Sequence, residues 1–331
     1  MSSQRPTPKF GLTLPNRGVI IGATTVEEML EMAEWADHDQ RWNSVWVGDS
    51  IFAKPRLDAI ALLGALAART RRVRLGPACF ASTPLRNALI LAYQWCCLDL
   101  MSNGRTIFVA CKGQSEPGGG LFDREFETLG IDPRSRTRRM EEAIEILRLV
   151  SSRENVDYAG KFCRFHNLTM LPRPIQQPIP IWVTANPNTT ALAEVQTGYR
   201  RVARLGDGWM TTGKTPEDLR NSLALVRGFA KELGRDLGND FEVALYYNIN
   251  VNENRESAFL ESKKFLDSYY MVNYAAEFLN NWVAMGSPEQ CIENIRAFIQ
   301  AGATTVTLRL TGYDQKAQFK RVTEEVLSKF V

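Results

Sequence analysis

The sequence predicts an α/β protein that folds as a single (β/α)8 TIM barrel. Short runs of β-branched and apolar residues alternate with stretches of helical period about eight times along the 331 residues, as parallel βα units do. No Gly-x-Gly-x-x-Gly motif follows the first run, which argues against a doubly wound dinucleotide-binding fold. One barrel can fill a chain of this length, so we expect a single domain over residues 1–331.

Eight strands and three marked helix starts support the barrel. The expected strands cover residues 10–14, 44–47, 73–75, 106–110, 181–183, 208–210, 241–249 and 305–310. Helices are expected to follow Thr25, Thr215 and Ser287, because an acid or amide stands three positions after each cap residue. Proline directly follows the last two caps, as is common at a first helical position.

Two segments exceed ordinary connections, one after the fourth strand and one before the last barrel helix. Residues 112–136 include three consecutive glycines and are expected to form a mobile lid loop. Residues 269–286 form an aromatic insertion, suited to core packing, a subunit interface or a substrate wall. A shorter excursion at 158–174 is expected to form a small hairpin before the fifth strand.

Composition and charge exclude several classes of function. The chain is 44% hydrophobic with a net charge of +3, which fits a globular protein without the basic footprint of a nucleic-acid-binding surface. No apolar run reaches the roughly 20 residues of a membrane helix, and the N-terminus lacks a signal core, so we expect a cytoplasmic protein. The six cysteines should be free thiols, and the spacing of His38 and His166 predicts no metal site.

Active sites of such barrels lie at the carboxyl ends of the strands, where this sequence is polar and rich in small residues. Small side chains let a flat ligand approach the backbone, and Lys112 is placed to bind an anionic group such as a phosphate. No nucleophile, base and acid are arranged as a hydrolytic triad. The strand ends therefore predict a cofactor site, built from Asn16, Asp49, Ser50, Ala78, Cys79, Cys111, Lys112, Gly113, Thr184, Ala185, Asn186 and Thr211 to Gly213.

Several longer motifs point to one family. They are VWVGD at 45–49, LDLMSNGR at 98–105, CKG at 111–113, FETLG at 126–130, PIWV at 180–183 and RVARLGDGW at 201–209. Together they resemble, in order and over roughly residues 9–310, the signature of the bacterial luciferase-like flavin-dependent oxidoreductases. The resemblance implies a (β/α)8 barrel that uses reduced FMN with O2 for monooxygenation, or a reduced deazaflavin, coenzyme F420, for hydride transfer.

The resemblance also implies where the cofactor phosphate lies. The family's phosphate-binding arginine falls on Lys112, which keeps the charge but loses the bidentate fork. Further phosphate contacts fall on Asn186 and Thr189, at the strand end and helix start that follow. About ten extra residues precede the later helix start at Gly198-Tyr199-Arg200-Arg201, which is the alternative phosphate site, with Arg200 or Arg201 as the partner.

Two further residue pairs are assigned by the resemblance. A cis peptide between Ala78 and Cys79 would shape the wall behind the flavin ring. Relatives carry an acid followed by histidine where this chain has Asp49 and Ser50, so these two are the candidate catalytic residues. Cys111 is expected to be a small residue beside the cofactor.

The leading functional prediction is a monooxygenase that uses reduced FMN and O2 to oxidise a small organic substrate. A separate NAD(P)H-dependent flavin reductase would supply the reduced FMN, and a homodimer is expected. The alternatives are a reductase or dehydrogenase that uses F420 on the same barrel, and a non-catalytic flavin-binding subunit.

Overall fold

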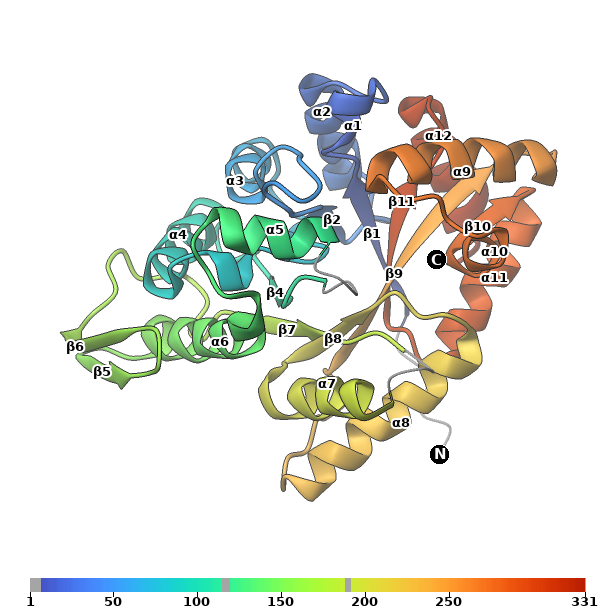
Figure 1. Cartoon of the computed structure of the whole chain (residues 1–331). Coiled ribbons are helices and arrows are strands. Elements are labelled where there is room, and N and C mark those ends of the chain that lie inside the picture. Colours follow the sequence, from blue (N-terminus) through green and yellow to red (C-terminus); the bar gives the residue numbers. More distant parts are fainter. Residues whose placement is uncertain (1–6, 115–119, 188–191, 331) are drawn as a thin grey trace.

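The computed structural model describes residues 7–114, 120–187 and 192–330 and confirms a (β/α)8 barrel (Figure 1). Eight parallel strands form the sheet in the order β3-β2-β1-β11-β9-β8-β7-β4. All eight coincide with predicted strands, with ends that differ by at most two residues: β1 Lys9–Leu14, β2 Ser44–Val47, β3 Arg74–Pro77, β4 Phe108–Ala110, β7 Ile181–Thr184, β8 Gly208–Thr211, β9 Glu242–Val251 and β11 Thr305–Leu310.

The sheet closes between β3 and β4, and this seam is the least paired. Two isolated bridges join the strands, Leu75 with Thr106 and Phe80 with Ala110. Between the bridges lies Pro77, which has no N–H to donate. The barrel is therefore nearly rather than uniformly closed.

Helices surround the barrel and return the chain from each strand end to the start of the next strand (Figure 1). Those in the described ranges are α1 Gly18–Ile21, α2 Val26–His38, α3 Ala59–Arg69, α4 Ala88–Met101, α5 Gly120–Thr128, α6 Arg136–Ser152, α7 Leu192–Leu205, α8 Pro216–Glu232, α9 Arg255–Tyr270, α10 Ala276–Trp282, α11 Pro288–Ala301 and α12 Gln315–Arg321. Single turns lie at Thr83–Leu85, Pro133–Ser135 and Leu327–Lys329, and a π-helical turn at Val322–Val326.

The three predicted helix starts are confirmed. Thr25 and Ser287 each accept a hydrogen bond from the backbone three residues on, and the Glu28 and Gln290 side chains bond back to complete capping boxes. Thr215 caps α8 in the same way through the backbone of Asp218. These local signals fix the start of a helix without help from the rest of the fold.

The long segments differ in part from their predictions. The hairpin is confirmed as β5 Val156–Ala159 and β6 Arg164–Leu168. The aromatic segment contains the end of α9, then α10, then a short strand, β10 Val283–Gly286, which pairs with β9. Residues 112–136 are not one loop, because α5 occupies 120–128 and α6 begins at Arg136. Three of the predicted lid's glycines span 118–120, of which 118 and 119 lie outside the described residues.

Two indole rings fill the middle of the barrel, where Trp46 and Trp182 lie with their ring centroids 5.3 Å apart. Glycines on neighbouring strands make room for them. A Cβ on Gly11 would lie 2.3 Å from Trp46, one on Gly76 2.8 Å from the same ring, and one on Gly208 2.5 Å from Trp182. These strand glycines are needed because the side chain of any other residue would collide with an indole.

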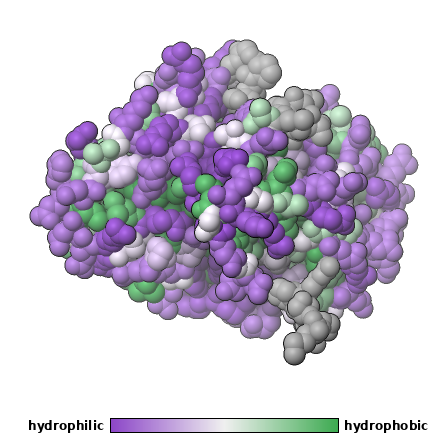
Figure 2. Space-filling model, turned by 90° about the horizontal axis from the view of Figure 1, so that it is seen from below, coloured by the Kyte–Doolittle hydropathy of each residue, from purple (hydrophilic) through white to green (hydrophobic). Residues whose placement is uncertain are grey.

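The face of the molecule seen in Figure 2 is mostly hydrophilic, with apolar residues in separate patches. Within the three described ranges, no helix combines the length and the apolar character needed to cross a bilayer.

Candidate active site

The end of β2 presents the best-placed acid, Asp49. Its side chain is 2% exposed and accepts a hydrogen bond of 2.6 Å from the backbone N–H of Ser82. The Arg86 guanidinium lies 3.9 Å away but pairs more closely with Asp58, at 2.6 Å. Burial dominates these contacts and raises the pKa of Asp49 to about 6. A carboxyl group that titrates this close to neutrality can both take up and release a proton.

The neighbouring candidate, Ser50, has a structural bond. Its hydroxyl accepts the backbone N–H of Lys54 at 2.9 Å and so shapes the loop that follows β2. The same loop is held by Glu125 of α5, whose buried carboxylate accepts the backbone N–H groups of residues 51, 52 and 53 at 2.7, 2.6 and 3.2 Å. Helix α5, within the predicted lid, is thus fastened to the β2 loop in this structure.

Two thiols face each other across the β3–β4 seam. The side chains of Cys79 and Cys111 lie within hydrogen-bonding reach, and Thr184 at the end of β7 also contacts Cys111. The hydrogen bond between the thiols lowers the pKa of Cys111 and raises that of Cys79. The peptide between Ala78 and Cys79 is cis, as the family resemblance implies.

The two predicted phosphate sites differ in what surrounds them. Lys112, at the end of β4, donates to Glu194 of α7 at 2.5 Å, and its side chain is 31% exposed. Asn186 is exposed, and its side-chain Oδ1 accepts the backbone N–H of Thr212 at 3.0 Å. Thr189 lies outside the described residues. Lys112 and Asn186 therefore stand at neighbouring strand ends.

The alternative phosphate site on α7 is engaged in packing. Tyr199 is 1% exposed and its hydroxyl is bonded to Ser222 of α8 at 2.6 Å. Arg200 pairs with Glu232 at the C-terminal end of α8, and a Cβ on Gly198 would lie 3.4 Å from the Cβ of Ala185. Arg201 is bonded to Glu141 of α6 at 2.8 Å. These residues join helices to one another.

The structure also brings together a group of residues that the sequence did not single out. Arg309 of β11 is fully buried, with its guanidinium carbon 4.1 Å from the ring centre of Tyr269. Its Nε donates to the hydroxyl of Tyr246 at 2.7 Å. The signal available in the sequence was the alternation in TVTLRL at 305–310, where every second residue is polar on an otherwise apolar strand.

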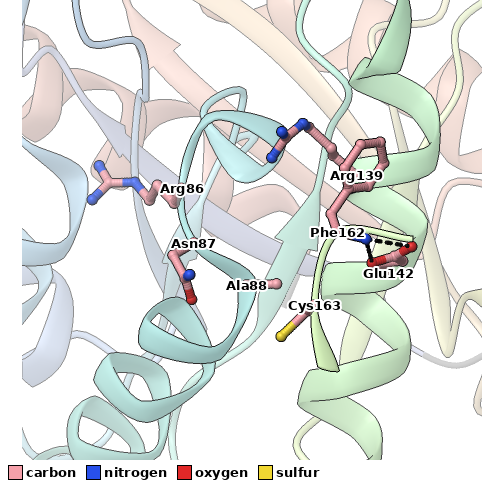
Figure 3. A pocket seen from close by; sticks show the side chains of 7 residues that line it. All are labelled: Arg86, Asn87, Ala88, Arg139, Glu142, Phe162 and Cys163. Atoms are coloured by element: carbon pink, nitrogen blue, oxygen red, sulfur yellow. Dashed lines mark hydrogen bonds between the residues drawn. The ribbon is translucent and has the colours of Figure 1, made fainter. Parts of the chain in front are cut away.

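A small pocket lies between the start of α4, α6 and the hairpin (Figure 3). Glu142 accepts the backbone N–H of Phe162 in its wall, at 3.0 Å. Arg86 lines the same pocket but directs its guanidinium away from Glu142 and Cys163, toward Asp49 and Asp58. Arg86 thus connects the pocket wall to the acid of the candidate site.

A parallel barrel that gathers a buried acid, thiols and a cation at its strand ends has the arrangement of a barrel enzyme. The chain belongs to the luciferase-like monooxygenase family, which it matches over residues 8–305. It is accordingly an oxidoreductase of the luciferase-like type, a family that uses FMN or F420.

The similar proteins include both dehydrogenases and a monooxygenase. The chain is 25% identical over 312 residues to an F420-dependent glucose-6-phosphate dehydrogenase of Amycolatopsis mediterranei, which covers 87% of this chain and 90% of that one. A second such dehydrogenase, from Segniliparus rotundus, is 27% identical over 78% of both chains. Among solved structures, the monooxygenase RslO1 of Streptomyces bottropensis superposes with a TM-score of 0.78 at 23% identity, covering 98% of this chain and 100% of that one.

Proposed function

We propose that this protein is an F420-dependent oxidoreductase that transfers a hydride to or from a small organic substrate, with Asp49 as the proton acceptor or donor. The observation that carries the proposal is the carboxyl group of Asp49 at the end of β2, whose side chain is 2% exposed and whose burial raises its pKa to about 6. The sequence favoured an FMN-dependent monooxygenase, and the curated relatives support the F420 alternative better.

The proposed reaction requires the protein to accept or donate one proton. A bound deazaflavin would supply the hydride acceptor. When an alcohol is oxidised to a carbonyl, its C–H bond gives up a hydride and its O–H bond gives up a proton. The carboxylate of Asp49 takes that proton, and it returns it in the reverse direction. The buried surroundings of Asp49 keep bulk water from exchanging with it during the step.

The strand ends of β3, β4 and β7 fit a flat cofactor. Their side chains are small and partly exposed, whereas the ends of β1 and β2 are buried. A planar ring can therefore approach the backbone on this side. Lys112 and Asn186 at neighbouring strand ends would hold the phosphate. The partly exposed set is Ala78, Cys79, Cys111, Thr184 and Ala185.

A second candidate is the FMN-dependent monooxygenase, which the description of the family supports. The same small side chains would accept either ring system. This function would require O2 and a separate reductase that supplies reduced FMN.

Titration with F420, FMN and reduced FMN, followed by absorbance, distinguishes the two. We expect tight binding of F420 and its substrate-dependent reduction, with glucose 6-phosphate and simple secondary alcohols as the first substrates. Binding of reduced FMN with coupled oxidation of a substrate by O2 would establish the monooxygenase instead. Cofactor binding without turnover of any substrate would favour the non-catalytic subunit.

The phosphate anchor gives a separate prediction. Lys112→Met should weaken binding of the cofactor about 10- to 100-fold, because a charge-assisted contact is lost, and should leave binding of its phosphate-free form nearly unchanged. Glu194→Gln should strengthen cofactor binding, since Lys112 is then no longer paired. Arg200→Met is the matched control and should have no effect. A loss of affinity in Arg200→Met but not in Lys112→Met would move the phosphate to α7.

A further inference from the structure

The polar side chains of Thr13, Asn248 and Arg309, on three adjacent strands, point into the barrel. Thr13 of β1 is paired with Trp46 of β2 on one side and with Arg309 of β11 on the other, and Arg309 is paired with Asn248 of β9. Paired residues of neighbouring parallel strands lie on the same face of the sheet. Because Trp46 packs against Trp182 inside the barrel, the other three also point inward.

These side chains keep polar atoms that meet no partner in the described part of the chain. Thr13, Asn248 and Arg309 are all 0% exposed. Arg309 uses Nε to bond Tyr246, and Asn248 uses its amide nitrogen to bond the backbone carbonyl of Trp282 at 3.0 Å. Both terminal nitrogens of Arg309, the side-chain oxygen of Asn248 and the hydroxyl of Thr13 make no hydrogen bond of good geometry. The Tyr269 hydroxyl also lies close to the guanidinium, and although burial opposes its ionisation, the positive charge of Arg309 helps to lower its pKa. Unsatisfied polar atoms in such a place are costly and call for a ligand.

The surroundings are positively charged and aromatic. Arg17, Arg56 and Arg309 form no ion pair with any carboxylate of the described ranges, and their hydrogen bonds go to neutral oxygens. Arg56 and Arg309 lie over the ring of Tyr269, at 5.3 and 4.1 Å from its centre. Tyr270 and its neighbours in α10 extend this aromatic surface. A buried guanidinium without a counter-charge needs an anion.

We propose that this group, which we call the Arg309 cluster (Thr13, Tyr246, Asn248, Tyr269 and Arg309), binds an anionic oxygen group of the substrate, a carboxylate or a phosphate. The two terminal nitrogens of Arg309 form a fork that suits such a group, and the hydroxyl of Thr13 can donate to the same anion. The side-chain oxygen of Asn248 can accept from a neighbouring hydroxyl of the substrate. The aromatic rings contact the body of the substrate. The inference rests on the proposed function in taking the barrel mouth as the site of reaction.

The location also separates this subsite from the cofactor's phosphate. In the sheet order, β11 lies across the barrel from β4, which carries Lys112. Two anion sites on opposite walls fit a cofactor anchored on one wall and a charged substrate anchored on the other. Arg56 and Lys54, in the loop after β2, lie over the rings of Tyr269 and Tyr270.

Anion binding to the chain without cofactor tests the proposal. The probes are benzoate, inorganic phosphate and neutral benzamide, and the readouts are calorimetry and the shift in melting temperature. We expect benzoate or phosphate to bind wild type saturably, and Arg309→Met to weaken that binding about 10- to 100-fold. Arg309→Lys should retain part of it, and benzamide should bind no more weakly to Arg309→Met than to wild type. Preference for benzoate or for phosphate identifies the anionic group.

A second variant guards against misfolding of Arg309→Met. Thr13→Val keeps the shape of the side chain and removes its unpartnered hydroxyl, so the ligand-free chain should be as stable as wild type or more so. Its affinity for the anion should fall several-fold. Failure of both anions to bind wild type, or equal binding by wild type and both variants, would overturn the proposal. Cofactor titration of the same proteins judges the proposed function independently, because the anion is tested without cofactor.

Discussion

Asp49→Asn is expected to lower kcat about 10²- to 10⁴-fold, the range that positioned proton transfer contributes to catalysis. Asparagine keeps the oxygen that accepts the Ser82 N–H but cannot take a proton from an alcohol. In wild type, kcat/KM for alcohol oxidation should rise with pH through about 6, as the carboxyl group ionises, and then level off. The variant should lack this rise.

In Asp49→Asn the free energy of unfolding should rise although kcat falls, and this difference distinguishes a chemical role from a folding defect. The native state holds the Asp49 proton more tightly than the unfolded chain does. The protonated carboxyl group therefore contributes fully to the stability of the folded state below about pH 4, and this contribution is lost as the pH rises through about 6. Asp49→Asn should therefore raise the free energy of unfolding at neutral pH, by at most about 3 kcal/mol.

The matched control for Asp49 is Asp58→Asn. It removes a carboxylate that pairs with the same Arg86 and keeps a good helix cap. It should leave kcat and its pH profile unchanged. If both variants lose activity equally, or if Asp49→Asn retains the rise near pH 6, another group carries the proton.

Gly208→Ala should lower the free energy of unfolding by about 3 kcal/mol or more, as overpacking of a dense core does at its upper end. The added Cβ would lie 2.5 Å from the indole of Trp182, which is already packed against Trp46. Chemical denaturation measures the change.

Gly228→Ala provides the comparison for Gly208→Ala. Gly228 is an exposed residue of α8, and a Cβ there would meet nothing within 4 Å. The substitution should stabilise the protein by up to about 1 kcal/mol, because alanine is the better helix former. Equal effects of the two substitutions would mean that the barrel interior relaxes around an extra methyl group.

The strand positions could be predicted because each is a compact apolar run between polar turns, and the helix starts because their caps act within four residues. The prediction that 112–136 is a loop was only partly right, because α5 and the start of α6 lie in this range. Residues 120–128 contain a hydrophobic face, with Phe122 and Phe126 four positions apart, that marks a helix, but the preceding glycines suggested a loop.

The candidate site could be predicted only in part. Asp49 and Cys111 follow strands directly, so their place at the barrel mouth is local information. Arg309 lies inside a strand, and from the sequence alone a charged strand residue is expected to face solvent. Only the closed sheet shows that its side chain faces the barrel interior. The pairing of Lys112 with Glu194, 82 residues later, is likewise a product of tertiary structure.

The seam between β3 and β4 determines where the folded barrel should open locally. Local opening in a folded protein is cheapest where the fewest backbone hydrogen bonds must break, and here two bridges hold the strands together. A brief separation of these two strands would leave the other strand pairings intact and expose the thiols of Cys79 and Cys111 further. The strand ends assigned to the cofactor are thus also those at which the sheet should open most easily. A ring bound across β3 and β4 would contact both strands and oppose that opening.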